Sequence, residues 1–283
     1  MRHFFLALGL ATLIVGTAAD TPPAFAADDT WVSATGGDSG ACAITTPCRT
    51  VNYALAQTTA GGTITILSSG RYDPATITKS VHIMADGVEA VFTKIGACDA
   101  VICIDAGPGD VVSLHGITIQ VPSPHVCCSS GIRFINGAGL HLNKCVVAGA
   151  TTFAVSYEPN SPSHLHVFDS NLSAAGVGVE VGASGGPVHS VFDRSEMHDG
   201  NQGFQFNGVG VGSIQATIRN SLIANHHGHS ILVYSDSTTP VPINLMVDHS
   251  VIANSDRWDR GRLRAEDSAD GRYGYQWSIF HLG

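Results

Sequence analysis

The sequence predicts an all-β fold, a right-handed parallel β-helix (a solenoid) with a short N-terminal capping helix. The first observation is a repeat, because similar openings recur between Leu142 and Asn254 at steps of 26, 24, 26 and 29 residues. The second is alternation: each opening is followed by a short segment in which every second residue is apolar. The third is composition, since 13% charged residues and 32 glycines suit stacked strands and tight turns. The second residues of the openings are Asn143, Asp169, Asp193, Arg219 and Asp248.

Residues 1–26 have the pattern of a secretory signal peptide. Arg2 and His3 precede an apolar run over residues 4–15, and Ala24-Phe25-Ala26 supplies small residues for cleavage. The alternative is an uncleaved anchor, but this run is short for a membrane span. No later stretch is long and apolar enough to span a membrane. We therefore expect a secreted or periplasmic protein.

Residues 27–62 predict an N-terminal strand followed by the capping helix. Residues 30–33 alternate like a strand, Thr50 is a suitable helix N-cap, and Gly61-Gly62 is expected to end the helix. The apolar positions at helical spacing are Val51, Ala54 and Leu55. A helix across the first coil would cover both an open strand edge and the end of the core.

Residues 63–256 are assigned to the coils of the β-helix, whose strands would pair in parallel at roughly 4.8 Å. Alternation places one set of side chains inside: Ile132, Phe134, Phe153, Val155, Val177, Val179, Phe204, Phe206, Ile231 and Val233. It places another set outside: Arg133, Gly178, Glu180, Gln205, Asn207, Leu232 and Tyr234. Aligning the openings predicts a column of small, mostly polar residues at a bend: Cys145, Asn171, Ser195, Ser221 and Ser250.

Residues 257–283 break the repeat and combine aromatic residues with arginines. We interpret them as a C-terminal cap, because an uncapped solenoid end exposes apolar core. The alternative is a partner-binding or glycan-binding arm, since Trp, Tyr and Arg dominate binding hot spots.

The seven cysteines pose a disulfide question in an exported protein. We expect Cys42 to pair with Cys48, and Cys98 to pair with Cys103. The remaining three are Cys127, Cys128 and Cys145. One of the adjacent pair could reach Cys145 in a neighbouring coil, which leaves one thiol over. Alternatively, all seven are small buried apolar residues.

The N-terminal motifs resemble those of a known group. These motifs are Trp31-Val32-Ser33 with a Gly/Asp loop, Pro47-Cys48-Arg49-Thr50 before a short helix, Gly61-Gly62-Thr63-Ile64, and Ile77-Thr78-Lys79-Ser80-Val81. They look like the start of secreted bacterial right-handed parallel β-helix proteins with the pectin-lyase-like fold. The resemblance implies the fold over the whole mature chain. It implies no reaction, because the fold hosts lyases, hydrolases, esterases, adhesins and tailspikes.

The usual catalytic motifs of polysaccharide-degrading enzymes with this fold are absent. The resemblance would imply Gly-His-Gly and Arg-x-Lys in a polygalacturonase, and neither occurs. Asp169 and Asp193 are the candidate catalytic pair, because the same slot in adjacent repeats would stack their carboxylates and raise one pKa. The structural alternative is favoured: Asn143 and Arg219 flank them in the same column, as in a solvated, charge-compensated ladder.

The outward side chains of the second strands form the candidate binding face: Arg133, Glu180, Gln205, Asn207 and Tyr234. Amide, charged and aromatic groups on a flat sheet suit sugar hydroxyls and rings. The alternative is an ordinary hydrated sheet face.

Fourteen histidines raise the question of a metal site. His226, His227 and His229, with His198 nearby, are the candidate ligands for a transition metal. No cysteine or repeated acidic partner defines a geometry there, so we expect neither a metal nor a cofactor. The other histidines are scattered over the expected strands and turns, and we interpret them as surface or hydrogen-bonded residues: His82, His115, His141, His164, His166, His189 and His249.

The formal net charge of −9 argues against nucleic acid as a partner. The leading hypothesis is a secreted, non-catalytic protein that presents a long β-face to polysaccharide or cell-surface glycan. The alternative is a polysaccharide-active enzyme, a glycoside hydrolase or lyase-like protein with an unfamiliar site. The sequence leaves the oligomeric state open.

Overall fold

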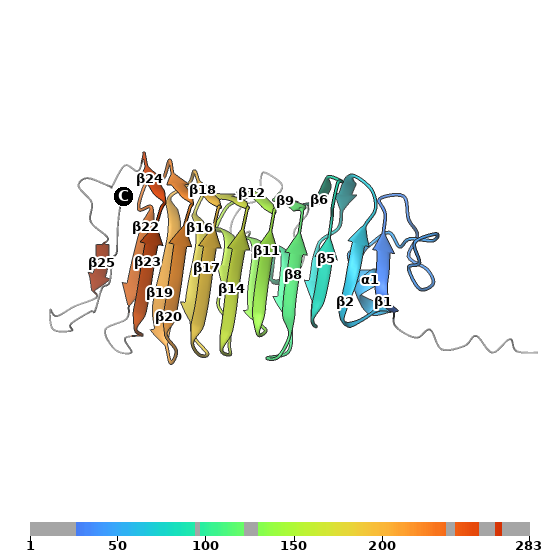
Figure 1. Ribbon diagram of the computed structural model, residues 1–283, viewed down its shortest axis with the longest axis horizontal. Coiled ribbons are helices and arrows are strands. Elements are labelled where there is room, and N and C mark those ends of the chain that lie inside the picture. Colours follow the sequence, from blue (N-terminus) through green and yellow to red (C-terminus); the bar gives the residue numbers. More distant parts are fainter. Residues whose placement is uncertain (1–26, 94–96, 122–129, 236–240, 255–263, 268–283) are drawn as a thin grey trace, which may run out of the picture.

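The computed structural model describes residues 27–93, 97–121, 130–235, 241–254 and 264–267. These residues form an elongated parallel β-helix, in which each coil contributes a strand to each of three parallel sheets (Figure 1). The predicted all-β solenoid is confirmed.

Sheet A follows the long axis of the molecule and faces the reader in Figure 1. Its strands, in spatial order, are β1 (Ala27–Val32), β2 (Thr58–Ile66), β5 (Val81–Met84), β8 (Val111–His115), β11 (Gly139–Asn143), β14 (Ser163–Phe168), β17 (Val188–Asp193), β20 (Ile214–Arg219) and β23 (Ile243–Asp248).

Sheets B and C complete each coil. Sheet B contains β3 (Gly70–Tyr72), β6 (Ala90–Thr93), β9 (Ile117–Gln120), β12 (Val146–Ala150), β15 (Asn171–Ala174), β18 (Glu196–His198), β21 (Leu222–Ala224) and β24 (Val251–Ala253). Sheet C contains β4 (Ala75–Ile77), β7 (Ala100–Asp105), β10 (Ser130–Asn136), β13 (Phe153–Tyr157), β16 (Val177–Ala183), β19 (Gln202–Gly210), β22 (Ile231–Ser235) and β25 (Arg264–Asp267).

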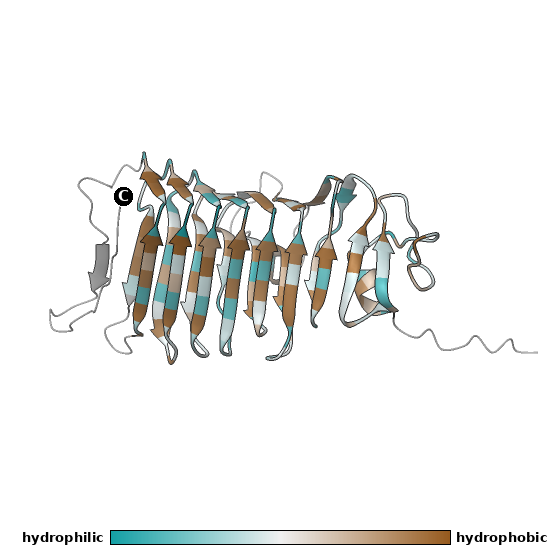
Figure 2. Ribbon diagram, viewed as in Figure 1, coloured by the Kyte–Doolittle hydropathy of each residue, from teal (hydrophilic) through white to brown (hydrophobic). Residues whose placement is uncertain are grey.

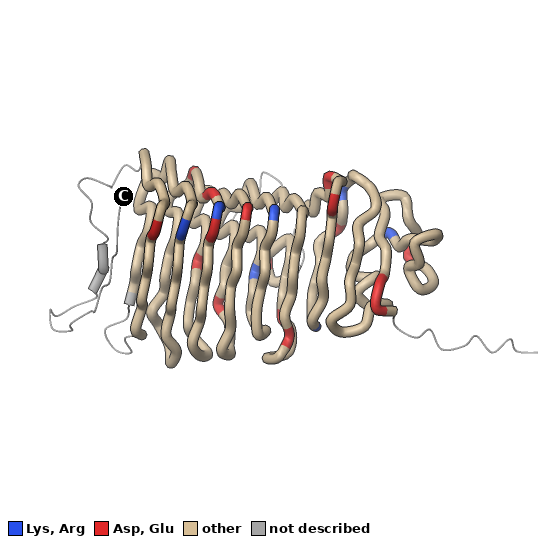
Figure 3. Tube along the Cα trace, in the orientation of Figure 1, with Lys and Arg blue, Asp and Glu red and all other residues tan. Residues whose placement is uncertain are grey.

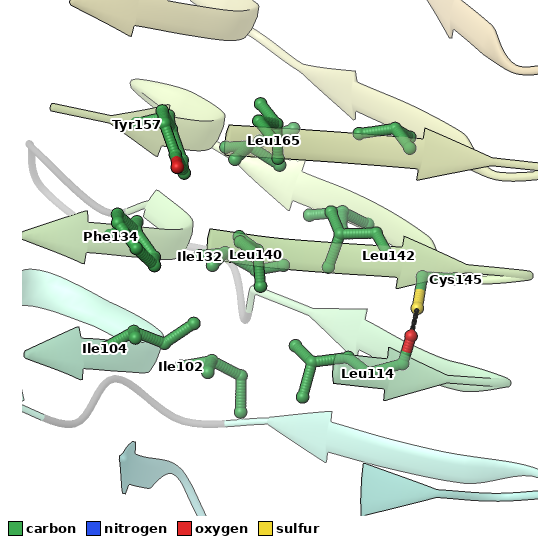
Figure 4. Packing of buried hydrophobic residues seen from close by; sticks show 14 of the residues in the cluster. Ile102, Ile104, Leu114, Ile132, Phe134, Leu140, Leu142, Cys145, Tyr157 and Leu165 are labelled. Atoms are coloured by element: carbon green, nitrogen blue, oxygen red, sulfur yellow. Dashed lines mark hydrogen bonds between the residues drawn. The ribbon is translucent and has the colours of Figure 1, made fainter. Parts of the chain in front are cut away.

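The core fills the space between the sheets with stacked apolar side chains. Strands of sheet A carry alternating brown and teal bands, as expected where one face is buried (Figure 2). In sheet C, Ile104, Phe134 and Tyr157 occupy successive coils at one position (Figure 4). The rings of Phe134 and Tyr157 stack with centroids 4.4 Å apart. Side chains at corresponding positions of adjacent coils thus pack directly on one another.

The predicted inward phase of the sheet C strands is confirmed with one exception. Val179 stacks on Phe204, and Phe206 stacks on Val233, all of them buried. Phe153 is only half-buried, because it is the first residue of β13 and lies at the turn into the strand.

The predicted polar column is wrong by one residue in one coil. Phe168 pairs with both Asn143 and Asp193, so this coil is shifted by one position relative to the predicted alignment. Ser170 therefore occupies the slot assigned to Asn171. Its hydroxyl accepts a hydrogen bond from the backbone N–H of Cys145 at 3.0 Å. The next serines repeat this contact from coil to coil: Ser195, Ser221 and Ser250.

The N-terminal helix α1 (Val51–Gln57) packs against β1, β2 and β4, with the predicted apolar face buried. Thr50 is its N-cap and accepts from the backbone N–H of Tyr53 at 3.2 Å, as predicted. The helix ends earlier than expected, because Thr58 is the C-cap and β2 begins there. Gly61 and Gly62 therefore lie within a strand instead of ending the helix.

Two predicted disulfides are present, Cys42–Cys48 and Cys98–Cys103. They are consistent with an oxidising compartment. The suggested bridge to Cys145 is wrong: its thiol is free, buried, and donates to the carbonyl of Leu114 at 3.3 Å (Figure 4). Cys127 and Cys128 lie outside the described residues.

The predicted signal peptide, residues 1–26, also lies outside the described residues, as does the tail apart from β25. The backbone of β25 pairs with β22 and extends sheet C by one strand. Among the residues described, no helix combines the length and apolar character needed to cross a bilayer.

Candidate functional site

The outer face of sheet C is hollowed where a glycine interrupts a row of side chains. Gly182 pairs with Asn207 in the next coil, and the side chain of Glu158 from the preceding coil lies over it. A Cβ atom at this position would come within 3.3 Å of Glu158 Cγ. A cleft of about 440 Å³ opens on this face, lined by Glu158, Gly182, Ser184, Gln205, Asn207, Val209, Leu232 and Tyr234.

The predicted binding face comes together around this cleft. Gln205, Asn207 and Tyr234 line it directly. Glu180 is the partner of Gln205 in the preceding coil. Arg133 lies two coils from Glu180 in the same row and donates to the carbonyl of Cys98 at 3.3 Å. The structure therefore places these five side chains on one face, with Arg133 at its margin.

Glu180 points to the outer face of the sheet, yet it is buried, with 6% of its surface exposed. One carboxylate oxygen accepts from Ser156 Oγ at 3.2 Å and the other from Asn207 Nδ2 at 2.7 Å. Burial, and then the neighbouring charge of Glu158, raise the pKa of Glu180 to about 7. The group can therefore hold or release a proton near neutral pH.

A short hydrogen-bond chain orients the amides beside the cleft. Gln205 Nε2 donates to Asn207 Oδ1 at 2.9 Å, and Asn207 donates onward to Glu180. Since an ionised carboxylate only accepts, it dictates which end of the Asn207 amide faces it. The arrangement presents oriented polar groups next to the ring of Tyr234 and the apolar side chain of Leu232. These are groups that hydrogen-bond hydroxyls and pack against the flat face of a ring.

Sequence reasoning missed Glu158, because it follows the last residue of β13 and falls outside the alternating strand pattern. The available signal was the glycine at position 182. A glycine in an outward strand position marks a place where something approaches closely or space is left.

The proposed stack of Asp169 and Asp193 is wrong in geometry, because of the one-residue shift. Arg194 lies between them: its Nε donates to Asp169 at 2.7 Å and its Nη1 to Asp193 at 2.8 Å. Asp193 also accepts from Asn220 at 3.0 Å and from Arg219 at 3.1 Å. Hydrogen bonds from Arg194 lower the pKa of Asp169, and those from Asn220 and Arg219 lower that of Asp193.

Asp169 and Asp193 therefore fit the structural interpretation, in which arginines compensate the charges of carboxylates in neighbouring coils. Figure 3 shows the row of charged residues where the strands of sheet A end. Neither carboxyl of this pair has the raised pKa that a catalytic acid would need.

The candidate histidine group does not form a ligand set either: within the part of the chain that the structure describes, the nitrogens of His198, His226, His227 and His229 do not converge on one point. His226 is buried, and burial lowers its pKa to about 4. His198 turns to Asn171, whose Oδ1 lies 2.7 Å from its Nε2. Among the described residues, the histidines whose ring nitrogens lie within 4.8 Å of one another are His141, His164 and His166.

Comparisons with known proteins agree with the fold. No protein-family model matches the sequence, and no curated protein matches it. Among solved structures, the crystal structure of pectate lyase Pel9A is similar, with a TM-score of 0.51 over 83% of this chain and 81% of that chain. The two sequences are 13% identical. The likeness establishes the shared parallel β-helix fold, and it assigns no reaction.

Proposed function

We propose that this is a secreted or periplasmic protein that binds polysaccharide in the cleft on sheet C without transforming it. The observation that carries the proposal is the hollow above Gly182. It is lined by two amides, one carboxyl and one tyrosine. Ligand sites typically combine a concave, partly apolar surface with a few placed polar groups.

The charges of the cleft favour a neutral sugar chain. Glu158 lines the cleft and raises the pKa of the neighbouring Glu180, and Arg133 offsets part of this effect. A chain of uronic acids would bring carboxylates against carboxylates, which costs free energy unless a cation intervenes. Hydroxyl groups, in contrast, can donate to the carboxylates and accept from Gln205.

The test is binding to a panel of neutral and acidic polysaccharides, followed by affinity measurements on variants. Asn207→Ala and Tyr234→Ala should each weaken binding by roughly tenfold or more, the effect of a lost hydrogen bond or packed ring at an interface. Gly182→Phe should abolish binding, because the new ring fills the hollow. Gln215→Ala is the matched control, since Gln215 is an exposed, outward amide on sheet A.

The proposal fails if Gln215→Ala weakens binding as much as Asn207→Ala, or if Gly182→Phe binds like the unmodified protein. Thermal unfolding of each variant establishes that it is folded.

A second candidate function is hydrolysis of the bound chain. It is favoured by one observation, the carboxyl of Glu180 with its pKa raised to about 7 beside Glu158. Glycoside hydrolysis uses such a pair, one protonated and one ionised. Release of reducing ends, lost in Glu180→Gln, would support hydrolysis and contradict the non-catalytic proposal. Binding without reducing or unsaturated products would exclude it.

A further inference from the structure

Three histidines converge on the outer face of sheet A, on two adjacent strands, whereas the cleft lies on sheet C. His141 of β11 pairs with His166 of β14, and Gly139 pairs with His164. The three ring centroids lie 5.0 Å apart in every pair. The Nε2 atoms of His141 and His164 are 2.9 Å apart.

Glycine makes this convergence possible. The position opposite His164 is Gly139, and a Cβ atom there would come within 2.3 Å of the His164 ring. The ring therefore folds over the glycine toward His141. On the other side, Phe168 meets His166 edge-on with centroids 5.9 Å apart. Both contacts restrict the rings to the space in which their nitrogens meet.

The spacing suits three nitrogen ligands of one ion. Zinc–nitrogen bonds of about 2.0–2.1 Å at tetrahedral angles place two ligand nitrogens roughly 3.3 Å apart. The candidate nitrogens all lie within 4.8 Å of one another, and the closest pair is at 2.9 Å. Small rotations about the side-chain bonds would reconcile these distances. The three rings are half-buried on an outer face, which leaves a fourth position open to solvent.

The geometry points to a metal site: we infer that His141, His164 and His166 bind one transition-metal dication, zinc or copper(II), with an open fourth position. Imidazole nitrogen favours these ions, whereas calcium and magnesium favour oxygen ligands. Three histidines with an open position are also the donor set of catalytic zinc sites. The site is independent of the sugar cleft, since the two lie on different sheets.

The test uses the mature chain without a purification tag that contains histidine. Titration calorimetry with zinc should show one equivalent bound. His141→Ala, His164→Ala and His166→Ala should each weaken binding by more than the ~10–100-fold that loss of an outer partner costs. His189→Ala is the matched control, because His189 is exposed on the same face and pairs with His164. Calcium should not compete.

Gly139→Ala provides a second variant that keeps all three ligands. Its methyl group displaces the His164 ring, so zinc affinity should fall at least tenfold while the melting temperature of the metal-free protein changes little. Copper(II) bound to the unmodified protein should show nitrogen coupling in its electron paramagnetic resonance spectrum, and this signal should change in His166→Ala.

The inference is overturned if the folded protein binds no zinc, or if the three alanine variants bind it as tightly as the unmodified chain. Loss of binding in a His227→Ala, His229→Ala double variant, with His141→Ala unaffected, would place the metal at the other histidine group and overturn it equally.

Discussion

At the scale of single residues, Glu180 shows that a side chain can point away from the core and still be buried. Its side chain points away from the core, yet neighbours in adjacent coils enclose it: Ser156 on one side and Asn207 on the other. The carboxyl loses its hydration and gains only two donors. Alternation along β16 predicted the outward direction correctly, while the burial depends on side chains that come from two other coils.

Glu180→Gln should change the pH dependence of stability. The pKa of the carboxyl is near its ordinary value of 4.5 in the unfolded state and about 7 in the folded state. Between these values the unfolded state binds fewer protons, so the free energy of unfolding falls as pH rises through this window. At about 1.4 kcal/mol for each unit of pKa difference, the loss is roughly 1–3 kcal/mol. Glutamine stays neutral, so the free energy of unfolding of Glu180→Gln should not fall in this window. Denaturant unfolding at pH 4.5 and pH 8 checks this: from the lower to the higher pH, the variant should gain this amount of stability relative to the unmodified protein.

Glu158→Gln is the companion variant. It removes the neighbouring charge, so the pH-dependent loss should shrink without disappearing. Parallel pH profiles of Glu180→Gln and the unmodified protein would contradict the assigned burial.

At the scale of elements, the repeated turn between sheets A and B imposes the same backbone on each coil. The residue before each small residue of the polar column is left-handed: Lys144, Asp169, Arg194, Asn220 and His249 have φ between 45° and 52°. Few side chains favour this region. The turn therefore requires the same left-handed backbone in these coils, although the residue type at this position varies.

Lys144→Gly should raise the free energy of unfolding. Lys144 is exposed and has φ 52°, so glycine removes a left-handed penalty of about 1–2 kcal/mol and adds chain entropy to the unfolded state. The net gain is roughly 0.5–1 kcal/mol by denaturant unfolding. Asn220→Gly should gain less, because asparagine tolerates the left-handed region.

Val146→Gly is the control for this prediction. Val146 is also exposed but lies in strand β12, where glycine lowers stability by roughly 0.5–1 kcal/mol. Equal losses in both glycine variants would show that the turn carries no strain.

At the scale of the whole molecule, each coil contacts mainly its neighbours, as the sheet order shows. Stability in such a solenoid is a sum of coil and interface contributions, so the ends are the least protected parts. At the N-terminal end, α1 covers the first coils, and the Cys42–Cys48 disulfide holds a loop against β1. Trp31 anchors this loop through backbone hydrogen bonds to both cysteines, at 2.8 and 2.9 Å.

Replacing Cys42 and Cys48 together by serine should loosen this end. Closing a loop of this length lowers the conformational entropy of the unfolded chain, which adds about 2 kcal/mol to the free energy of unfolding. Because the contacts are local, hydrogen exchange should quicken in β1 and α1 and stay unchanged in β14 and β16. Uniformly faster exchange along the molecule would mean that the coils unfold as one cooperative unit.

By itself, the sequence determined the fold class, the helix with its N-cap, the two described disulfides, and the face on which most strand residues lie. These features follow from local patterns, since a period of two assigns each side chain to the core or the outside. The same pattern placed Gln205, Asn207 and Tyr234 on one face.

Only the tertiary structure decided which outward side chains meet. Coils differ in length, so a residue's neighbour in space is set by strand register, and a slip of one residue separated Asp169 from the slot of Asp193. The same register brings His141 against His166, which are distant in sequence, and it leaves the hollow above Gly182. Local alternation carries no information on these pairings, because they depend on the lengths of the turns between strands.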